Sequence, residues 1–216
     1  DGKAISAQIK DELKKKVEVL KETQGISVCL AVIQVGSDPA STVYVGNKKK
    51  ACAYIGIDSL SYELPEETTQ EELLTLIGEL NGNKEVNGIL VQLPLPEHID
   101  EDAVIRAIDP KKDVDGFHPQ SVGALCIGQP GFVSCTPAGI IQLLKRSGIE
   151  IAGRECVIVG RSNIVGKPMA LLLLRENGTV TVAHSRTANL QEVTKRADIL
   201  VVAVGRPKMI TRDYVK

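Results

Sequence analysis

The chain has 216 residues, of which 43% are hydrophobic and 25% are charged, as is ordinary for a globular protein of one or two domains. Its 26 basic and 27 acidic residues leave a net charge of -1, so it lacks the basic field that nucleic-acid binding requires. No apolar run approaches the roughly 18 to 20 residues that span a bilayer. Five cysteines without a CxxC spacing argue against a disulfide scaffold, so we expect a cytoplasmic protein.

The first part of the chain is predicted to alternate helix and strand. Apolar residues recur every three to four positions over residues 3–24, which is typical of an amphipathic helix. The apolar run at residues 28–35 is closed by a Gly-Ser-Asp-Pro turn and predicts a buried strand. A second helix is expected to begin at Ser41, as its N-cap, and to end at Gly56.

The next predicted helix carries an N-terminal capping box. Thr68 and Thr69 each precede a glutamate by three residues, and either pair suits the box; the helix ends near residues 81–83. A buried strand follows at residues 86–91, and the prolines after it stop further pairing. A short helix and a loop come next.

A domain boundary is predicted where a well-delimited helix begins. Thr136 suits its N-cap, Pro137 its first position and Gly148 its end, giving domains 1–135 and 136–216. The second domain then alternates strands and helices, a pattern that predicts a parallel, Rossmann-like sheet with helices on both faces. These elements are expected at residues 155–159, 167–177, 179–184, 190–196 and 198–204.

Only three strands are predicted in the second domain. A complete sheet of this class has about six, so we expect the domain to be incomplete and the chain to be a fragment of the working protein. The last strand would then expose an unpaired edge.

A glycine turn joins the first strand of this domain to its helix. Between Gly160 and Gly166, backbone N–H groups and the helix dipole suit a pyrophosphate. The spacing departs from GxGxxG, with Ser162 at the middle glycine position and one additional residue before Gly166. The alternative is that the two glycines only allow the strand and helix to pack closely.

The end of the next strand indicates which dinucleotide is bound. An acidic residue there favours NAD, whereas this chain has Ser185 and Arg186, which suit the 2′-phosphate of NADP. Arg161 in the glycine turn is a second cationic candidate. The alternative is that Arg186 is a solvated loop residue. His184 is expected to pack at the strand end.

Candidate substrate-binding residues occur in the first domain. Ser41, Tyr44 and Lys48 stand at i, i+3 and i+7 on one helix face. Gln92 follows a buried strand, at the edge where ligands of open α/β sheets bind, although it could simply bond the proline-rich backbone. Lysine can act as an acid or base where an apolar cleft removes its solvation. Asp113 and Asp115 have too few oxygen ligands nearby for a calcium or magnesium site, so no metal is expected.

Taken together, five motifs in register resemble the methylenetetrahydrofolate dehydrogenase/cyclohydrolase family. They are Tyr44-Val-Gly-Asn-Lys48-Lys-Lys-Ala51, Gly88-Ile-Leu-Val-Gln92-Leu-Pro-Leu-Pro96, Lys112-Asp-Val-Asp115-Gly116, Cys135-Thr-Pro137 and Gly160-Arg-Ser-Asn-Ile-Val-Gly166-Lys-Pro168. The resemblance implies an N-terminal folate-binding catalytic domain, a C-terminal NADP-binding domain and a folate cleft between them. It further implies hydride transfer from the 5,10-methylene carbon to NADP, then addition of water to give 10-formyltetrahydrofolate.

The resemblance also implies residue roles. Tyr44 would pack on the aminobenzoate ring of the folate, Lys48 would serve water addition, Gln92 would tune Lys48, and Asp115 would bind the amino-pyrimidine edge of the pterin. Ser41 is added as a substrate-binding candidate. The cofactor-binding candidates are Gly160, Arg161, Ser162, Gly166, Ser185 and Arg186.

The family usually forms homodimers through the cofactor domain, so the resemblance implies a homodimer here. Two other interpretations remain open. One is another two-domain NAD(P)-dependent dehydrogenase, acting on amino or hydroxy acids, and the other is a non-catalytic nucleotide-binding module. The first leaves Tyr44, Lys48, Gln92 and Asp115 unexplained as a set.

Overall fold

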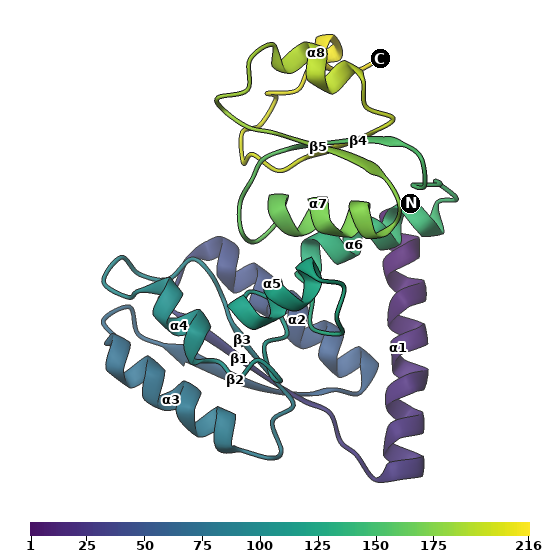
Figure 1. Ribbon diagram of the computed structural model, residues 1–216. Helices are drawn as coiled ribbons and strands as arrows, with labels where there is room; N and C mark the ends of the chain where they lie inside the picture. The colour runs from purple at the N-terminus through teal and green to yellow at the C-terminus, as the bar shows by residue number, and fades with distance from the viewer. The chain divides into compact units, whose positions relative to one another are not determined.

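The computed structural model describes all 216 residues, which form two compact α/β units, Asp1–Val114 and Asp115–Lys216 (Figure 1). The predicted α/β class is confirmed in both units. The first unit contains α1 (Gly2–Gln24), β1 (Cys29–Val35), α2 (Pro39–Ile55), β2 (Asp58–Leu64), α3 (Gln70–Gly82), β3 (Gly88–Val91) and α4 (Glu101–Ala107).

The sheet of the first unit is parallel, with strand order β2-β1-β3. The central strand β1 is buried on both faces, which is why its sequence is continuously apolar. Ala31 and Ile33 join the core cluster that includes α3 and α4, whereas Val32 packs with Val45 of α2. The sheet therefore has helices on both sides, and the ends of β1 and β3 meet at one edge.

The strand β2 is not among the predicted elements. Its sequence, Asp-Ser-Leu-Ser-Tyr-Glu-Leu, has charged and polar residues at most positions, because β2 is an edge strand with one side exposed. It pairs with β1 along its whole length, from Asp58 opposite Cys29 to Leu64 opposite Val35. The sequence of β2 does not identify it as a strand by itself; its pairing with β1 in the folded structure does.

The predicted start of α2 at Ser41 is wrong. Pro39 is the first residue of the helix, and Asp38 is its N-cap. The Asp38 carboxylate accepts a hydrogen bond from the amide of Ser41 at 2.7 Å, and proline is well tolerated at the first helical position. The predicted end is confirmed, because Gly56 has φ 89° and its amide donates to the carbonyl of Cys52.

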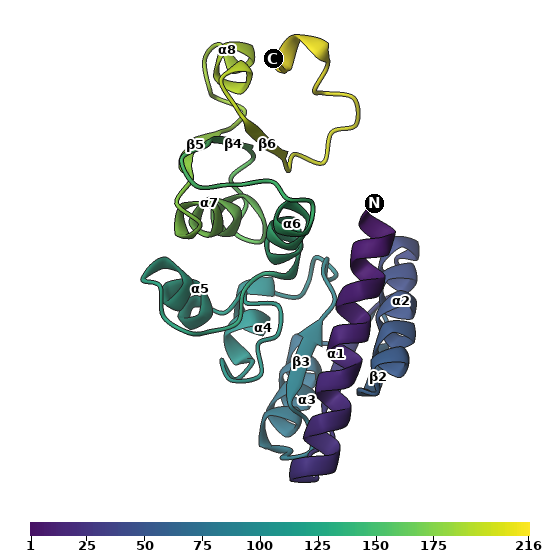
Figure 2. The same cartoon turned by 90° about the vertical axis from the view of Figure 1, so that its right-hand side faces the viewer.

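Of the two possible capping boxes before α3, the structure forms the one with Thr69. Its hydroxyl accepts from the amide of Glu72, and the Glu72 carboxylate accepts from the amide of Thr69 at 2.8 Å. The bonds that the Thr69 amide and hydroxyl donate to this carboxylate hold the pKa of Glu72 below its ordinary value. The first unit also includes α1, which lies beside α2 (Figure 2). The Tyr54 hydroxyl of α2 donates to Asp11 of α1.

The second unit has a parallel sheet of order β5-β4-β6. Its core combines Cys156 and Ile158 of β4 with Met169 and Leu173 of the following helix. The predicted alternation of strand and helix is confirmed, with bounds within two residues. The elements are α5 (Pro119–Cys126), α6 (Cys135–Arg146), β4 (Glu155–Val159), α7 (Gly166–Arg175), β5 (Thr179–Ala183), α8 (Leu190–Lys195), β6 (Ile199–Val202) and η1 (Arg212–Tyr214).

Two features of the second unit differ from the sequence-based expectation. The helix α5 is not predicted; His118 caps it, with its Nδ1 accepting from the amide of Gln120 at 3.0 Å. The N-cap of α6 is Ser134 instead of Thr136. Pro137 is thus the third helical residue, where no N–H is required for the helix. Residues 115–135 belong to this compact unit, and the start of the cofactor domain at residue 136 stays a prediction.

Candidate active site

The centre of the candidate site is a hydrogen bond between Lys48 and Gln92. The Lys48 Nζ of α2 donates to the Gln92 Oε1 at 3.0 Å. Gln92 follows β3, and its amide donates to the carbonyl of Ile33 in β1 at 2.8 Å. Its Nε2 donates to the carbonyl of Leu93 at 2.7 Å. Gln92 therefore has both roles considered for it, since it binds Lys48 and also bonds the proline-rich backbone.

The three consecutive lysines of α2 have different surroundings. Lys48 is half-buried and reaches Gln92, whereas Lys49 pairs with Glu63 of β2 at 2.7 Å. The hydrogen bond from Lys49 holds the pKa of Glu63 below its ordinary value. Lys50 is exposed and forms no ion pair. Only Lys48 thus presents an ammonium at the strand ends.

Tyr44 and Ser41 lie on the same helix as Lys48 but differ in exposure. The Tyr44 side chain is 62% exposed, so its ring is available to a ligand. Ser41 is buried, and its amide donates to the carboxylate of Asp38. This hydrogen bond holds the pKa of Asp38 below its ordinary value. Ser41 has a structural role at the start of α2, and its substrate role stays a prediction.

The loop that contains Asp113 is tied to the first sheet through Lys112. The Lys112 Nζ donates to three carbonyls at the end of α3, those of Leu80, Asn81 and Asn83, at 2.7 to 2.9 Å. Its carbonyl accepts from the amide of Ile89. A lysine at a helix C-terminus is favoured by the helix dipole. This contact is not anticipated from the sequence, although Lys112 stands in a recognised motif.

Asp115 begins the second unit and is half-buried. Its contact with a pterin stays a prediction. No group of three or more His, Cys, Asp or Glu side chains is placed to hold a metal ion.

In the glycine turn of the second unit, backbone segments approach so closely that only glycine fits at positions 160 and 166. A Cβ on Gly160 would lie 2.3 Å from the carbonyl oxygen of Ala203, and Gly160 has φ 129°. A Cβ on Gly166 would lie 2.3 Å from the carbonyl oxygen of Gly160. Both glycines are therefore required for the close approach of backbone segments.

The first-turn amides of α7 already have partners within the chain. The Ser162 hydroxyl accepts from the amides of Val165 and Gly166 at 3.2 and 3.3 Å, and its carbonyl accepts from that of Lys167. This differs from the expectation that these amides meet a pyrophosphate directly. The exposed part of the turn is residues 161–164. Its middle is held by Ser134, whose hydroxyl donates to the carbonyl of Ile164 at 2.5 Å.

A hydrogen-bonded turn after β5 carries the other cofactor candidates. The Thr187 hydroxyl accepts from the His184 amide at 2.8 Å, and the His184 Nδ1 accepts from the Arg186 amide at 3.2 Å. His184 thus organises the turn, and Ser185 and Arg186 are exposed at its tip. The amide of Gly160 donates to the carbonyl of Ala183. Arg161 and Arg186 therefore follow neighbouring strand ends, and neither forms an ion pair.

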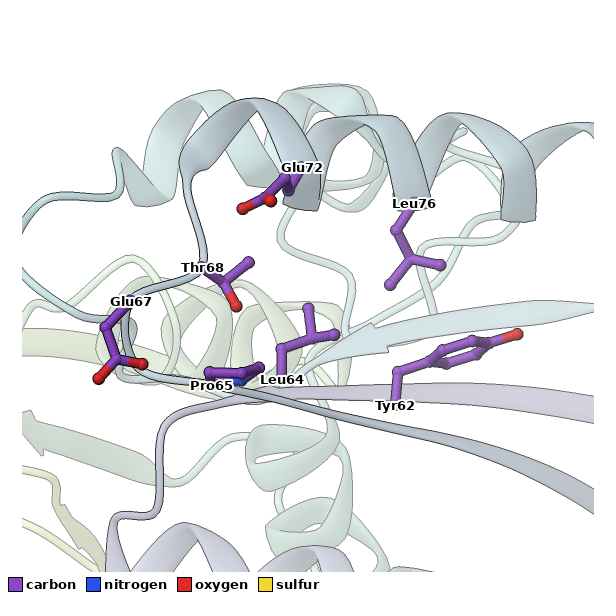
Figure 3. A pocket seen from close by; sticks show the side chains of 7 residues that line it. All are labelled: Tyr62, Leu64, Pro65, Glu67, Thr68, Glu72 and Leu76. Atoms are coloured by element: carbon purple, nitrogen blue, oxygen red, sulfur yellow. The ribbon is translucent and has the colours of Figure 1, made fainter.

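A separate groove lies between β2 and α3, away from these residues (Figure 3). Tyr62 and Leu64 of β2 lie on one side of it and Leu76 and Glu72 of α3 on the other, and Glu67 stands at one end. Neither Lys48 nor Gln92 lines this groove, so it is not part of the candidate active site.

These features define a class of protein: a two-unit parallel α/β chain whose second unit has the strand–glycine turn–helix arrangement of dinucleotide-binding enzymes. Residues 1–115 match the catalytic domain of tetrahydrofolate dehydrogenase/cyclohydrolase, and residues 134–216 match the NAD(P)-binding domain of the same enzymes. The chain belongs to the tetrahydrofolate dehydrogenase/cyclohydrolase family.

Individual relatives are similar over the whole chain. The bifunctional protein FolD of Lachnoclostridium phytofermentans is 74% identical over 216 residues, which are 100% of this chain and 76% of that protein. The FolD crystal structure from Campylobacter jejuni is 52% identical with a TM-score of 0.97, and the match covers 100% of this chain and 77% of that one. The Trypanosoma brucei FolD, complexed with NADP cofactor and inhibitor, is 38% identical with a TM-score of 0.95, over 100% of this chain and 74% of that one.

The chain contains no helix that is both long enough and apolar enough to cross a membrane.

Proposed function

We propose that this protein oxidises 5,10-methylenetetrahydrofolate to 5,10-methenyltetrahydrofolate with NADP, and hydrolyses the product to 10-formyltetrahydrofolate. The observation that carries the proposal is the 3.0 Å hydrogen bond from Lys48 to Gln92 at the strand ends, within residues matching the family's catalytic domain. An ammonium held beside a sheet edge is suited to proton transfer.

Hydride transfer requires alignment of two reacting carbons. Bound NADP supplies the hydride acceptor. The chain's own residues hold the folate and exclude water. The exposed ring of Tyr44 packs against the aminobenzoate group, and Asp115 accepts hydrogen bonds from the two neighbouring N–H donors of the pterin edge.

The cofactor candidates suit NADP by their chemistry. Two exposed guanidinium groups, on Arg161 and Arg186, and the hydroxyl of Ser185 supply donors for the 2′-phosphate. The tight approach at Gly160 and Gly166 forms the turn. The Ser162 hydroxyl already accepts hydrogen bonds from amides at the start of α7. The pyrophosphate therefore binds at the exposed residues 161–164, where the dipole of α7 favours a negative charge.

Cyclohydrolysis is the addition of water to the methenyl carbon. The water oxygen bonds to that carbon, and the bond from the carbon to N5 breaks with its electron pair left on N5. One of the two water protons ends on N5 and the other is released, which leaves the formyl group on N10. Lys48 transfers the proton at its Nζ. Gln92 holds the Nζ through its Oε1 while its own Nε2 is fixed on the carbonyl of Leu93.

The test is an assay of the purified protein with 5,10-methylenetetrahydrofolate, run with NADP and with NAD. We expect folate-dependent reduction of NADP and decay of the methenyl absorbance. Reduction of NADP only with an amino or hydroxy acid would instead support the other dehydrogenase. Nucleotide binding without turnover of any of these substrates would support the non-catalytic module.

Two further properties are proposed with the function. All five cysteines are free, which fits a reducing cytoplasm. Homodimerisation through the cofactor domain rests on the family resemblance. Light scattering of the purified protein tests it, since a homodimer has twice the mass of a single chain, of which the 216 residues account for 23.2 kDa.

A further inference from the structure

A buried glutamine lies next to the candidate site but has no part in the mechanism above. Gln34, near the end of β1, is only 5% exposed. Its Nε2 donates to the carbonyl of Gly36 and to the hydroxyl of Thr42, both at 3.1 Å. A buried amide needs such partners, and here one of them belongs to α2. Gln34 therefore links the central strand to the helix that carries Lys48.

Thr42 connects this amide to the first turn of α2. Its Oγ1 accepts from Gln34 and donates to the carbonyl of Asp38 at 3.0 Å. The N-cap Asp38 in turn accepts from the amide of Ser41. The start of α2 is thus fixed in place by side chains, and Lys48 follows Thr42 by six residues on the same continuous helix.

The hydrogen bonds form a closed circuit around the candidate site. Gln92 is anchored on β1 through its amide, which donates to Ile33, the residue just before Gln34. Lys48 is anchored on β1 through α2, Thr42 and Gln34. The bond from Lys48 to Gln92 closes the circuit. One strand therefore positions both members of the pair.

We propose that Gln34 is a positioning residue for the cyclohydrolase step. Through its bond to Thr42 it holds α2 in place and so fixes the distance between the Lys48 Nζ and Gln92. The inference rests on the proposed function. A small displacement of a catalytic group can lower a rate severely, whereas hydride transfer does not use Lys48. Loss of the link is expected to slow hydrolysis of methenyltetrahydrofolate more than its formation.

The experiment removes the link at Thr42 and uses Thr75 as its matched control. Each threonine hydroxyl donates to the carbonyl four residues earlier in its helix, Thr42 to Asp38 and Thr75 to Glu71. Only Thr42 also accepts from Gln34. Thr42→Val and Thr75→Val therefore make the same local change, and Thr42→Ser retains the hydroxyl. Gln34→Met removes the link from the other side.

We expect Thr42→Val and Gln34→Met to lower kcat for hydrolysis by about tenfold or more, with a smaller change in KM and in the dehydrogenase rate. Thr75→Val should match the unaltered protein, and Thr42→Ser should restore most of the rate. If Gln34→Met does not fold, the three threonine variants decide the question.

Three results would overturn the inference. The first is equal hydrolysis by Thr42→Val and Thr75→Val. The second is a proportional loss of both activities in Thr42→Val, as instability alone would cause. The third is absence of both activities from the unaltered protein, which would also overturn the proposed function.

Discussion

Replacing Lys48 with methionine should separate the two proposed activities. Methionine has a similar length and no charge, so it retains the packing of the half-buried side chain while removing the proton-transfer group. Gln92 loses the donor at its Oε1 but keeps its own bond to the carbonyl of Leu93. The geometry of the strand end should therefore persist.

The expected magnitude follows from what Lys48 does. A positioned acid or base contributes about 10² to 10⁴ in rate, which is about 2.7 to 5.4 kcal/mol at 1.36 kcal/mol per tenfold. The lost hydrogen bond costs about 0.5 to 3 kcal/mol of stability. Hydrolysis of methenyltetrahydrofolate should thus nearly cease, while dehydrogenase activity stays measurable because it depends on alignment.

Lys49→Met is the matched control. Lys49 neighbours Lys48 in sequence, but its ammonium pairs with Glu63 on the exposed side of β2. Such pairs contribute about 0 to 1 kcal/mol, so both activities should be retained. Both are followed spectrophotometrically, as reduction of NADP and as decay of the methenyl absorbance. Full hydrolysis by Lys48→Met would refute the assignment of Lys48.

Three further predictions concern the cofactor turn and the start of α2. Arg186→Ala should weaken NADP binding by about 1.5 to 3 kcal/mol and leave NAD binding nearly unchanged in a titration; an equal loss for both would make Arg161 the better candidate. Gly166→Ala should abolish binding of both dinucleotides, because its Cβ would lie 2.3 Å from the carbonyl oxygen of Gly160; unchanged dissociation constants would contradict the tight turn. The lowered pKa of Asp38 means that its contribution to stability is present above the unfolded-state pKa and is lost as pH falls through the folded-state value. Asp38→Asn, which retains an N-cap acceptor, should therefore reduce the fall in Tm with acidification, and an unaltered Tm profile would argue against this contribution.

The sequence by itself determined the parts of this protein whose physics is local. The apolar run of β1, the presence of a capping box before α3 and the glycine at the end of α2 are each determined by residues close together in the sequence. The order of strands and helices from α6 to β6 follows from the alternation of apolar runs with turn residues. The candidate residues Lys48 and Gln92 were also evident, because one shares a helix face with Tyr44 and the other follows a buried strand.

The tertiary structure alone decided which of these residues meet and what holds them. Lys48 and Gln92 are 44 positions apart in sequence. Their bond depends on α2 packing, through Val45, on the sheet face formed by Val32 of β1 and Leu90 of β3. The edge strand β2 has too few apolar residues to be recognised without its partner. Gln34 and Ser134 are ordinary polar residues in the sequence, yet both are buried. Gln34 bonds Thr42 of the following helix, and Ser134 bonds the carbonyl of Ile164, 30 residues away. Such pairings need the chain to be folded first, since no local pattern specifies which backbone or side chain will satisfy a buried polar group.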